Sequence, residues 1–211
     1  MTAPIATPRK HKRVVKTPEA RRADILRASR EVFGTVGFAD ATIADITTAA
    51  GMGKGSFYMH FETKDHVLAA LWEQYVNAFY DTTQEILRKG QAWWPTMDEL
   101  LRRLLEHAIE NAELHRLVYG SANGKALELC KESNARVIDS ICDFVRRGAA
   151  AGAFQSANPE WAFRMVYHAA DGLLDDLIAD GAPIDAKAVS RSVLEMAHRT
   201  FGDPDLVSTG R

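Results

Sequence analysis

Cysteine is scarce in this chain: its 211 residues include only Cys130 and Cys142. Both lie on one predicted helix, more than two turns apart, so they cannot form a disulfide within it. The chain also lacks an apolar run long enough to cross a bilayer, and the basic residues between 9 and 16 lead into no apolar segment of the signal-peptide type. These absences predict a reduced, cytoplasmic protein.

Residue patterns of catalytic and metal sites are equally absent. The histidines form no His-x-x-x-His pair of the zinc-site type, and no serine lies in the sequence context of a nucleophile elbow. Residues 51–56 (GMGKGS) differ from a phosphate-binding loop, because Gly55 follows Lys54 where such a loop needs Ser or Thr, and because a helix is predicted before them. The sequence therefore predicts neither an enzyme nor a bound metal or cofactor.

What the chain does contain is helical periodicity. Apolar residues make up 46% of the sequence, as in a globular protein with a substantial core. They recur at helical spacing, and no strand-like alternation, repeat or low-complexity tract interrupts the pattern. The prediction is an all-α fold of about nine helices, at roughly residues 18–36, 43–50, 54–61, 64–89, 97–111, 113–119, 126–151, 159–179 and 186–201.

Capping residues mark several helix starts. Thr17 before Pro18 opens the first predicted helix, and Asn158 before a proline opens the eighth. Thr96 and Glu99 have the spacing of a capping box, which predicts that the fifth helix begins at residue 97 and that residues 91–95 form a loop.

Charge is distributed unevenly along the chain. Residues 1–66 hold eleven of the 26 Lys and Arg residues and seven of the 28 acidic residues, a net charge of +4, which leaves −6 for residues 67–211. A basic front and an acidic rear fit a nucleic-acid-binding domain joined to a domain of another kind. The basic cluster before residue 17 is interpreted equally well as an arm that contacts DNA or as a solvated tail.

Residues 42–61 (TIADITTAAGMGKGSFYMHF) predict two short helices joined by a tight turn. Thr42 is a suitable N-cap with Asp45 at the third helical position, and Gly51 can end the first helix in a left-handed conformation. Phe57 and Phe61, four residues apart, give the second helix a buried stripe, which leaves its polar residues free. This arrangement is typical of a helix-turn-helix motif.

The motif lies within a longer set of characteristic residues: Ile25-Leu26-x-Ala28, Phe33-x-x-x-Gly37-Phe38, Thr42-Ile43-x-x-Ile46, Ala49-x-Gly51, Gly53-Lys54-Gly55-Ser56-Phe57-Tyr58-x-His60-Phe61 and Lys64-x-x-x-Leu68. With them, residues 20–71 resemble the DNA-binding domain of the TetR/AcrR family of bacterial transcriptional regulators. The resemblance implies a basic N-terminal arm (1–16), a three-helix DNA-binding domain (17–66) and a helical ligand-binding and dimerisation domain (67–211). The implied function is that of a repressor, released from a palindromic operator by a small-molecule effector.

The resemblance and the chemistry of the side chains together predict the contacts with DNA. Lys54 and Ser56 can read base edges, while Met59 can only pack against a thymine methyl group. Four residues are expected to hold phosphates, namely Thr42, Tyr58, His60 and Lys64. Tyr58 and His60 fit internal packing as well. The predicted DNA-binding residues are Thr42, Gly53, Lys54, Gly55, Ser56, Tyr58, Met59, His60 and Lys64.

Aromatic residues of the rear half predict a small-molecule site between helices, although for any single one of them a place in the ordinary core is the more frequent case. Asp171 and Asp175, four residues apart, would meet a cationic ligand if they face inward, or form part of a solvated acidic face. The candidate ligand-binding residues are Trp72, Tyr75, Phe79, Trp93, Trp94, Tyr119, Tyr167, His168 and Asp171.

The last two predicted helices are amphipathic and fit the dimer interface that the resemblance implies. Its candidate residues are Met165, Ala169, Leu173, Leu177, Val193 and Ala197. Two alternatives to a homodimeric DNA-binding repressor stay open on the sequence. One is a protein that binds or sequesters a small molecule and has a non-functional DNA-binding domain, and the other is an α-helical enzyme.

Overall fold

The computed structural model describes residues 16–121 and 124–202, and within these ranges every regular element is a helix. The predicted arm falls almost wholly outside them. The helices are α1 (Pro18–Val36), α2 (Ile43–Ala49), α3 (Lys54–Tyr58), α4 (Lys64–Lys89), α5 (Trp93–Glu110), α6 (Ala112–Ser121), α7 (Gly124–Ala150), α8 (Pro159–Asp180) and α9 (Ala186–Phe201). The predicted all-α fold is confirmed.

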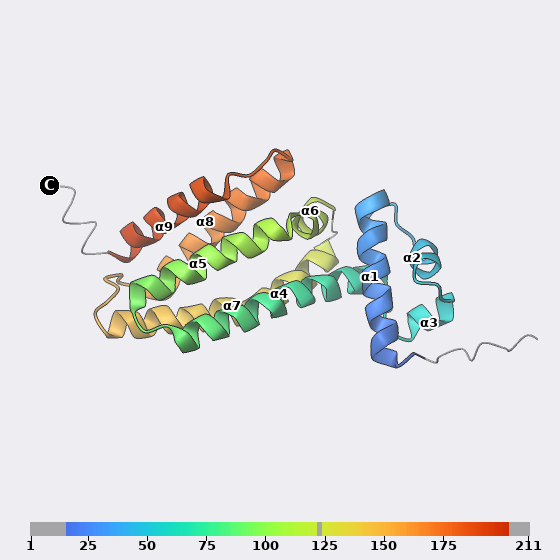
Figure 1. Cartoon of the computed structure of the whole chain (residues 1–211), viewed down its shortest axis with the longest axis horizontal. Coiled ribbons are helices and arrows are strands. Elements are labelled where there is room, and N and C mark those ends of the chain that lie inside the picture. Colours follow the sequence, from blue (N-terminus) through green and yellow to red (C-terminus); the bar gives the residue numbers. More distant parts are fainter. Residues whose placement is uncertain (1–15, 122–123, 203–211) are drawn as a thin grey trace, which may run out of the picture.

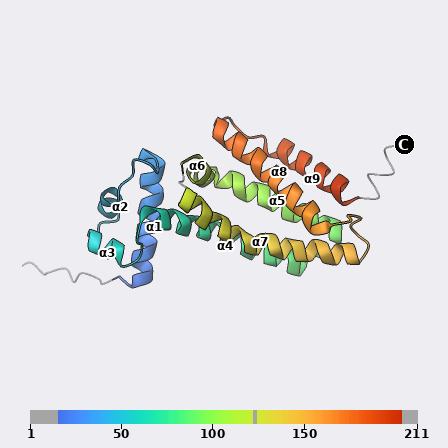
Figure 2. The same cartoon turned by 180° about the vertical axis from the view of Figure 1, so that it is seen from behind.

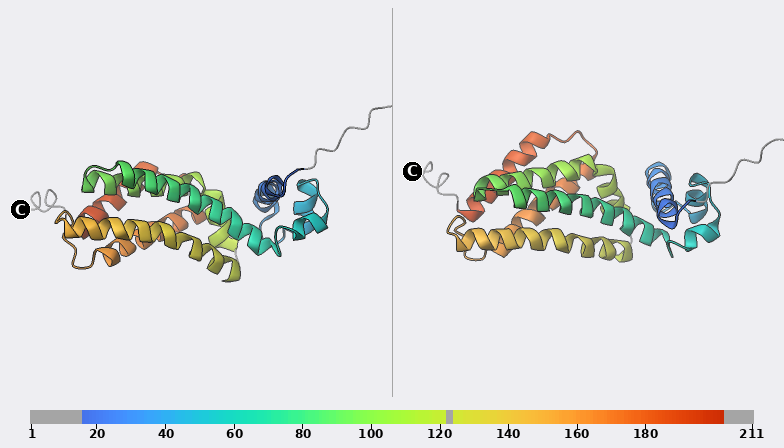
Figure 3. Two further views of the ribbon diagram at one scale, coloured as in Figure 1. Left: turned by 90° about the horizontal axis from the view of Figure 1, so that it is seen from below. Right: turned by 60° about the horizontal axis from the view of Figure 1, so that its bottom comes forward.

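The helices form two parts that α4 connects. α1 stands across one end of the long helices, and α2 and α3 lie beyond it (Figure 1). α4 starts beside this small group and runs into a bundle with α5–α9, where it packs extensively along α7 (Figures 2 and 3). One helix therefore belongs to both the N-terminal group and the bundle.

Local capping interactions explain where most helices begin. The side chains of Thr17, Thr42 and Thr63 accept hydrogen bonds from backbone N–H groups in the first turns of α1, α2 and α4. Asn158 and Asp185 do the same for α8 and α9. These starts agree with the predictions because the interactions that create them lie within a few residues.

The predicted start of the fifth helix is wrong. α5 begins at Trp93, four residues early, and the Thr96 hydroxyl donates to the carbonyl of Ala92 at 2.6 Å instead of capping a helix at residue 97. Pro95 falls in the first turn of α5, where its missing N–H removes no intrahelical hydrogen bond. Residues 93–95 are therefore helical rather than part of a loop.

A single apolar core runs from the N-terminal group into the bundle. Its largest fully buried side chains include Phe33 and Phe57 in the N-terminal group and Trp72, Phe163 and Phe201 in the bundle. None of the helices that the structure describes is long and apolar enough to cross a membrane.

Candidate functional site

α3 presents side chains that the sequence predicts to read DNA. Phe57 is fully buried and its ring centroid lies 6.1 Å from that of Phe61, so these two rings anchor the short helix to the core. The opposite side of the helix faces solvent. Tyr58 is 56% exposed and Met59, directly after the helix, is 82% exposed, while Lys54 is exposed at the helix start. Large apolar side chains this exposed indicate a contact surface.

Gly53 and Gly55 flank Lys54 without serving the internal packing of the chain. A Cβ atom on either glycine would meet no atom within 4 Å, and Gly53 has an ordinary extended conformation. Because neither glycine has a side chain that projects from the surface beside Lys54, the backbone of a second molecule can come close there. Ser56 and His60 are half-buried at the same surface.

Thr42 is exposed, but its hydroxyl group already serves the capping box of α2. It donates to Oδ2 of Asp45 at 2.6 Å and accepts from the Asp45 N–H at 3.2 Å. The Thr42 hydroxyl and the Thr42 backbone N–H, which donates to the same oxygen at 2.9 Å, hold the pKa of the Asp45 carboxyl group below its usual range. One acceptor position of the hydroxyl and the backbone near the N-terminus of α2 stay available to a partner.

Lys64, the first residue of α4, fastens that helix to the turn between α1 and α2. Its Nζ donates to the carbonyl oxygens of Phe38 (2.7 Å), Ala39 (2.8 Å) and Ala41 (3.0 Å) and lies 4.8 Å from the centroid of the Phe38 ring. An ammonium group has three donors, so all of them are engaged. A phosphate contact by Lys64 stays a prediction, and it requires at least one of these hydrogen bonds to be shared or broken.

Replacing Lys64 by Met should lower the free energy of unfolding by about 1–3 kcal/mol, because three carbonyl groups lose a charged donor. Thermal unfolding of the variant measures this, and Lys54→Met, which removes an exposed lysine, is the matched control with little expected change. An unaltered melting temperature for Lys64→Met would contradict the anchoring role. The predicted phosphate contact of Lys64 is tested by the salt dependence of DNA affinity. Loss of one phosphate contact flattens the slope of log affinity against log salt concentration by about one unit.

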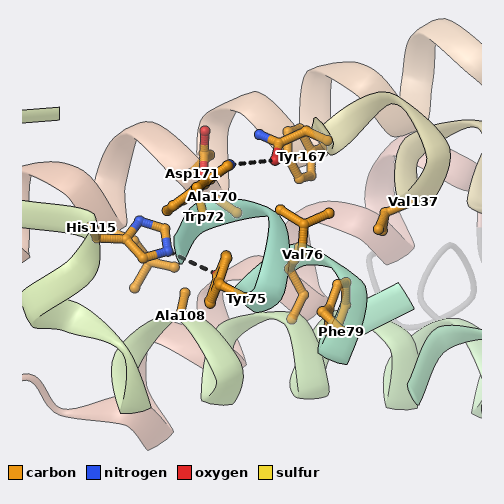
Figure 4. Close-up of a pocket in the computed structure, with 13 residues that line it drawn as sticks. Trp72, Tyr75, Val76, Phe79, Ala108, His115, Val137, Tyr167, Ala170 and Asp171 are labelled. Atoms are coloured by element: carbon orange, nitrogen blue, oxygen red, sulfur yellow. Dashed lines mark hydrogen bonds between the residues drawn. The ribbon is translucent and has the colours of Figure 1, made fainter. Parts of the chain in front are cut away.

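A narrow cavity lies inside the bundle between α4, α5, α6, α7 and α8 (Figure 4). Its volume of about 30 Å³ gives room for roughly one or two water molecules. Aromatic rings from α4 and α8 form much of its wall. The lining residues are Trp72, Tyr75, Val76, Phe79, Leu104, Ala108, His115, Asn134, Val137, Tyr167, Ala170, Asp171 and Leu174.

A polar relay centred on His115 crosses this cavity from α8 to α4. His115 is buried, with Nε2 2.8 Å from Oη of Tyr75 and Nδ1 3.3 Å from Oδ1 of Asp175. Burial raises the pKa of Tyr75, which therefore keeps its proton. A neutral His115 protonated at Nδ1 would donate to Asp175 and accept from the Tyr75 hydroxyl, which satisfies both nitrogens.

The same part of α4 is held by two further polar contacts. Nε1 of Trp72 donates to Oδ1 of Asn134 at 3.0 Å, and Nε2 of His107 lies 3.0 Å from the carbonyl oxygen of Tyr75. The His107 ring stacks on the Tyr75 ring with centroids 4.3 Å apart. Desolvation lowers the pKa of His107, which favours the neutral imidazole in this stack.

Asp171 differs from the other polar groups of the cavity. Among the residues that the structure describes, it has no hydrogen-bond or ion-pair partner, although it lies one turn from Asp175. Burial raises the pKa of the Asp171 carboxyl group, and the neighbouring Asp175 raises it further. Within the described part of the chain, the charge of this carboxylate is therefore not neutralised by a direct contact.

The structure brings together five of the nine predicted ligand-binding residues. Trp72, Tyr75, Phe79, Tyr167 and Asp171 all line the cavity.

The other four lie elsewhere. Trp93 and Trp94 pack in an aromatic cluster around Phe154 at the far end of the bundle, with centroid separations of 6.2 and 5.1 Å from that ring. Tyr119 stacks beside His115 but does not line the cavity, and His168 is exposed on α8.

Sequence reasoning missed His115 and Asn134 as cavity residues. His115 lies four residues before Tyr119 and so shares its helical face, which is a signal that the sequence did contain. For Asn134 no such signal exists, because its contact with Trp72 joins residues 62 positions apart.

The predicted dimer interface separates into exposed and buried residues. Met165 and Leu173 on α8 are 63% and 42% exposed, and Ala169 between them is exposed too. Val193 and Ala197 on α9 are instead buried, because they face the chain's own core. These two cannot present surface to a second copy in this packing. Leu177 is half-buried.

An exposed helix-turn-helix attached to a helical bundle defines a protein of the helix-turn-helix DNA-binding class. Residues 25–71 match the family model of bacterial regulatory proteins, tetR family. The chain is 31% identical over 77 residues to the uncharacterized HTH-type transcriptional regulator YvdT of Bacillus subtilis, a match that covers 36% of this chain and 40% of YvdT. Residues 25–71 are thus similar to the DNA-binding domain of tetR-family regulators, and the chain spans less than half the length of YvdT.

Two further likenesses extend beyond the DNA-binding domain. The HTH-type transcriptional repressor KstR2 of Mycolicibacterium smegmatis is 23% identical over 143 residues, covering 65% of this chain and 69% of that protein. The solved structure of FadR from Bacillus subtilis, described as a complex with stearoyl-CoA, has a TM-score of 0.73 and 18% identity, and covers 83% of this chain and 96% of that chain. Likeness at this level of identity shows a shared fold.

Proposed function

We propose that the protein is a homodimeric transcriptional repressor that leaves a palindromic DNA operator when a small-molecule effector binds in the bundle cavity. The observation that carries this proposal is the continuity of α4. Its first residue, Lys64, is fastened to the turn that precedes α2, and Trp72, eight residues later, begins the cavity wall. At 1.5 Å per residue these positions are about 12 Å apart on one rigid helix.

At the DNA end, α3 enters the major groove with its first turn toward the bases. Lys54 and Ser56 contact base edges, and Gly53 and Gly55 allow the close approach. Met59 packs against a thymine methyl group. Contacts to phosphate hold the domain in register without specifying sequence, and the residues assigned to them are Thr42, Tyr58, His60 and Lys64.

A dimer is proposed because one five-residue reading helix covers few base pairs, and two-fold symmetry doubles the site. The exposed apolar residues of α8 supply a surface for it, and α9 lies beside α8 at the same edge of the bundle (Figure 1). Such a protein acts where the bacterial DNA is, in the cytoplasm.

The effector acts by preferring one conformation. If it binds more tightly to an arrangement of α4 in which the two reading helices no longer match successive major grooves, it shifts the dimer away from DNA. The KstR2 repressors and the structure of FadR with stearoyl-CoA support this reading as relatives in sequence and fold.

Selection from random duplex DNA tests the proposal. The full chain should enrich a palindrome whose half-sites are about one helical turn apart or a multiple of it. Affinity should fall steeply with salt, since phosphate contacts release counterions. Lys54→Ala should weaken binding and relax specificity at one position of each half-site, whereas Arg103→Ala, on the outer surface of α5, should change neither. Folded, dimeric protein that enriches no motif would instead support the reading as a small-molecule binding or sequestering protein.

A further inference from the structure

Aromatic rings and one unneutralised carboxylate dominate the cavity wall. The rings of Trp72, Tyr75 and Phe79 on α4 and of Tyr167 on α8 line it, and Asp171 is the one carboxyl group among the lining residues that the structure describes. No Lys or Arg side chain belongs to the lining that the structure describes. An ionised Asp171 would thus meet no cationic Lys or Arg side chain in the described lining, and the low polarity nearby would strengthen its attraction for a cation.

We propose that the effector is an organic cation with a compact apolar body, such as an aryl or alkyl amine, whose ammonium group pairs with Asp171. This inference rests on the function proposed above, because it names the ligand class of the same cavity. The aromatic rings receive the apolar body and offer π faces to the positive charge, which is the combination that recognises organic ammonium ions in proteins. An anion would meet an unpaired carboxylate instead.

The two acids of this face have different roles. Asp175 is already engaged by Nδ1 of His115, which in turn contacts Tyr75. Asp171 has no such partner among the described residues and lies next to Ala170 and Trp72 at the edge of the group of lining side chains (Figure 4). A carboxylate in such a setting disfavours its own charge until a cation arrives, as the raised pKa of Asp171 indicates. Asp171 therefore binds the ligand, and Asp175 positions His115.

Binding must enlarge the cavity. A typical ligand site has several hundred Å³, on the order of ten times the 30 Å³ found here. The walls that an entering molecule pushes apart are α4 and α8, on which Trp72, Tyr75 and Asp171 lie. Displacement of α4 moves the end that Lys64 fastens to the DNA-binding domain. Ligand entry is therefore coupled to loss of the DNA-bound geometry, because both require the displacement of α4.

Three probes with one apolar body test the proposed charge: phenylbutylamine, phenylbutanol and phenylbutyrate. Titration calorimetry on the full-length protein should show the amine binding about tenfold more tightly than the alcohol, the scale of one partly desolvated ion pair with an aromatic contact. The carboxylate should bind most weakly. Equal or tighter binding of phenylbutyrate or of lauroyl-CoA, or no binding of the amine up to millimolar concentration, would overturn the assignment.

Two variants identify the residue responsible. Asp171→Asn should abolish the preference for the amine over the alcohol while leaving the affinity for the alcohol unchanged. Asp176→Asn, on the exposed side of the same helix, should keep the preference. An amine preference that persists in Asp171→Asn would refute its role. Operator binding measured on the same samples separates the two proposals, since a protein that binds operator but prefers anions is a regulator with another ligand class.

Discussion

Replacing Met165 by Glu, alone and with Leu173→Glu, should convert the proposed dimer into a monomer and reduce operator affinity by roughly a hundredfold or more. The monomer keeps one reading helix per molecule and loses the gain that comes from linking two half-sites, which is typically 10²–10⁴. The double variant should show the larger effect, because each carboxylate would be buried next to its own symmetry mate.

The physical basis of this prediction is the stripe formed by Trp161, Met165, Ala169 and Leu173 on α8. Trp161 is 69% exposed, and the four residues recur every four positions on one face of the helix. Neighbouring large apolar residues at this exposure are unusual on a monomer and mark an interaction surface. A glutamate in the middle of this stripe would oppose its burial in an interface. It would not disturb the core of the chain, because the position is exposed.

Sedimentation measures the association state, and a gel-shift titration on the selected operator measures affinity. Asp81→Arg, a charge reversal at an exposed position of α4, is the control and should leave both unchanged. Retention of the dimer by the double variant would place the interface on another surface. A monomer with undiminished affinity would contradict the requirement for two half-sites.

Features that depend on neighbouring residues were predictable from the sequence. The capping of α2 by Thr42 and Asp45 and the inward positions of Phe57 and Phe61 follow from spacing alone, and the structure shows both. The start of α5 was not predictable in the same way. Trp93 and Trp94 pack against Phe154, 60 or more residues away, and this tertiary contact accompanies a helix that begins before Pro95.

The cavity, too, combines features that local spacing predicts with features that depend on tertiary contacts. Periodicity could place Trp72, Tyr75 and Phe79 on one face of α4, but it could not pair them with Asn134 or His115 on other helices. For α9, periodicity identified an apolar face that includes Val193 and Ala197. Whether such a face is covered by the same chain or by a second copy is a property of the tertiary arrangement, and here the same chain covers it.

Phe57→Ala should abolish operator binding and destabilise the N-terminal group of helices by about 3–5 kcal/mol, the range for removing a fully buried Phe side chain. α3 has five residues, far fewer than the 12–15 or so that a helix needs to persist alone, so its position depends on this anchor. The ring of Phe57 packs against Phe61 and against the edge of Tyr58, with centroids 6.1 and 5.6 Å away. The bundle and its cavity should stay intact.

Tyr58→Ala is the matched comparison, because Tyr58 is the next residue along and points outward. Its loss should change the free energy of unfolding by less than about 1 kcal/mol, as expected of one exposed aromatic contact. Operator affinity should still fall by about tenfold if the hydroxyl holds a phosphate.

Hydrogen exchange resolves the two effects by region. In Phe57→Ala the amides of α2 and α3 should lose protection while those of α5, α8 and α9 keep theirs, and in Tyr58→Ala all should keep it. If Phe57→Ala still bound the operator with α3 protected, the anchoring argument would fail. If Tyr58→Ala bound as tightly as the parent protein, the exposed face of α3 would lose Tyr58 as a DNA contact, and Lys54 and Ser56 would have to supply the affinity.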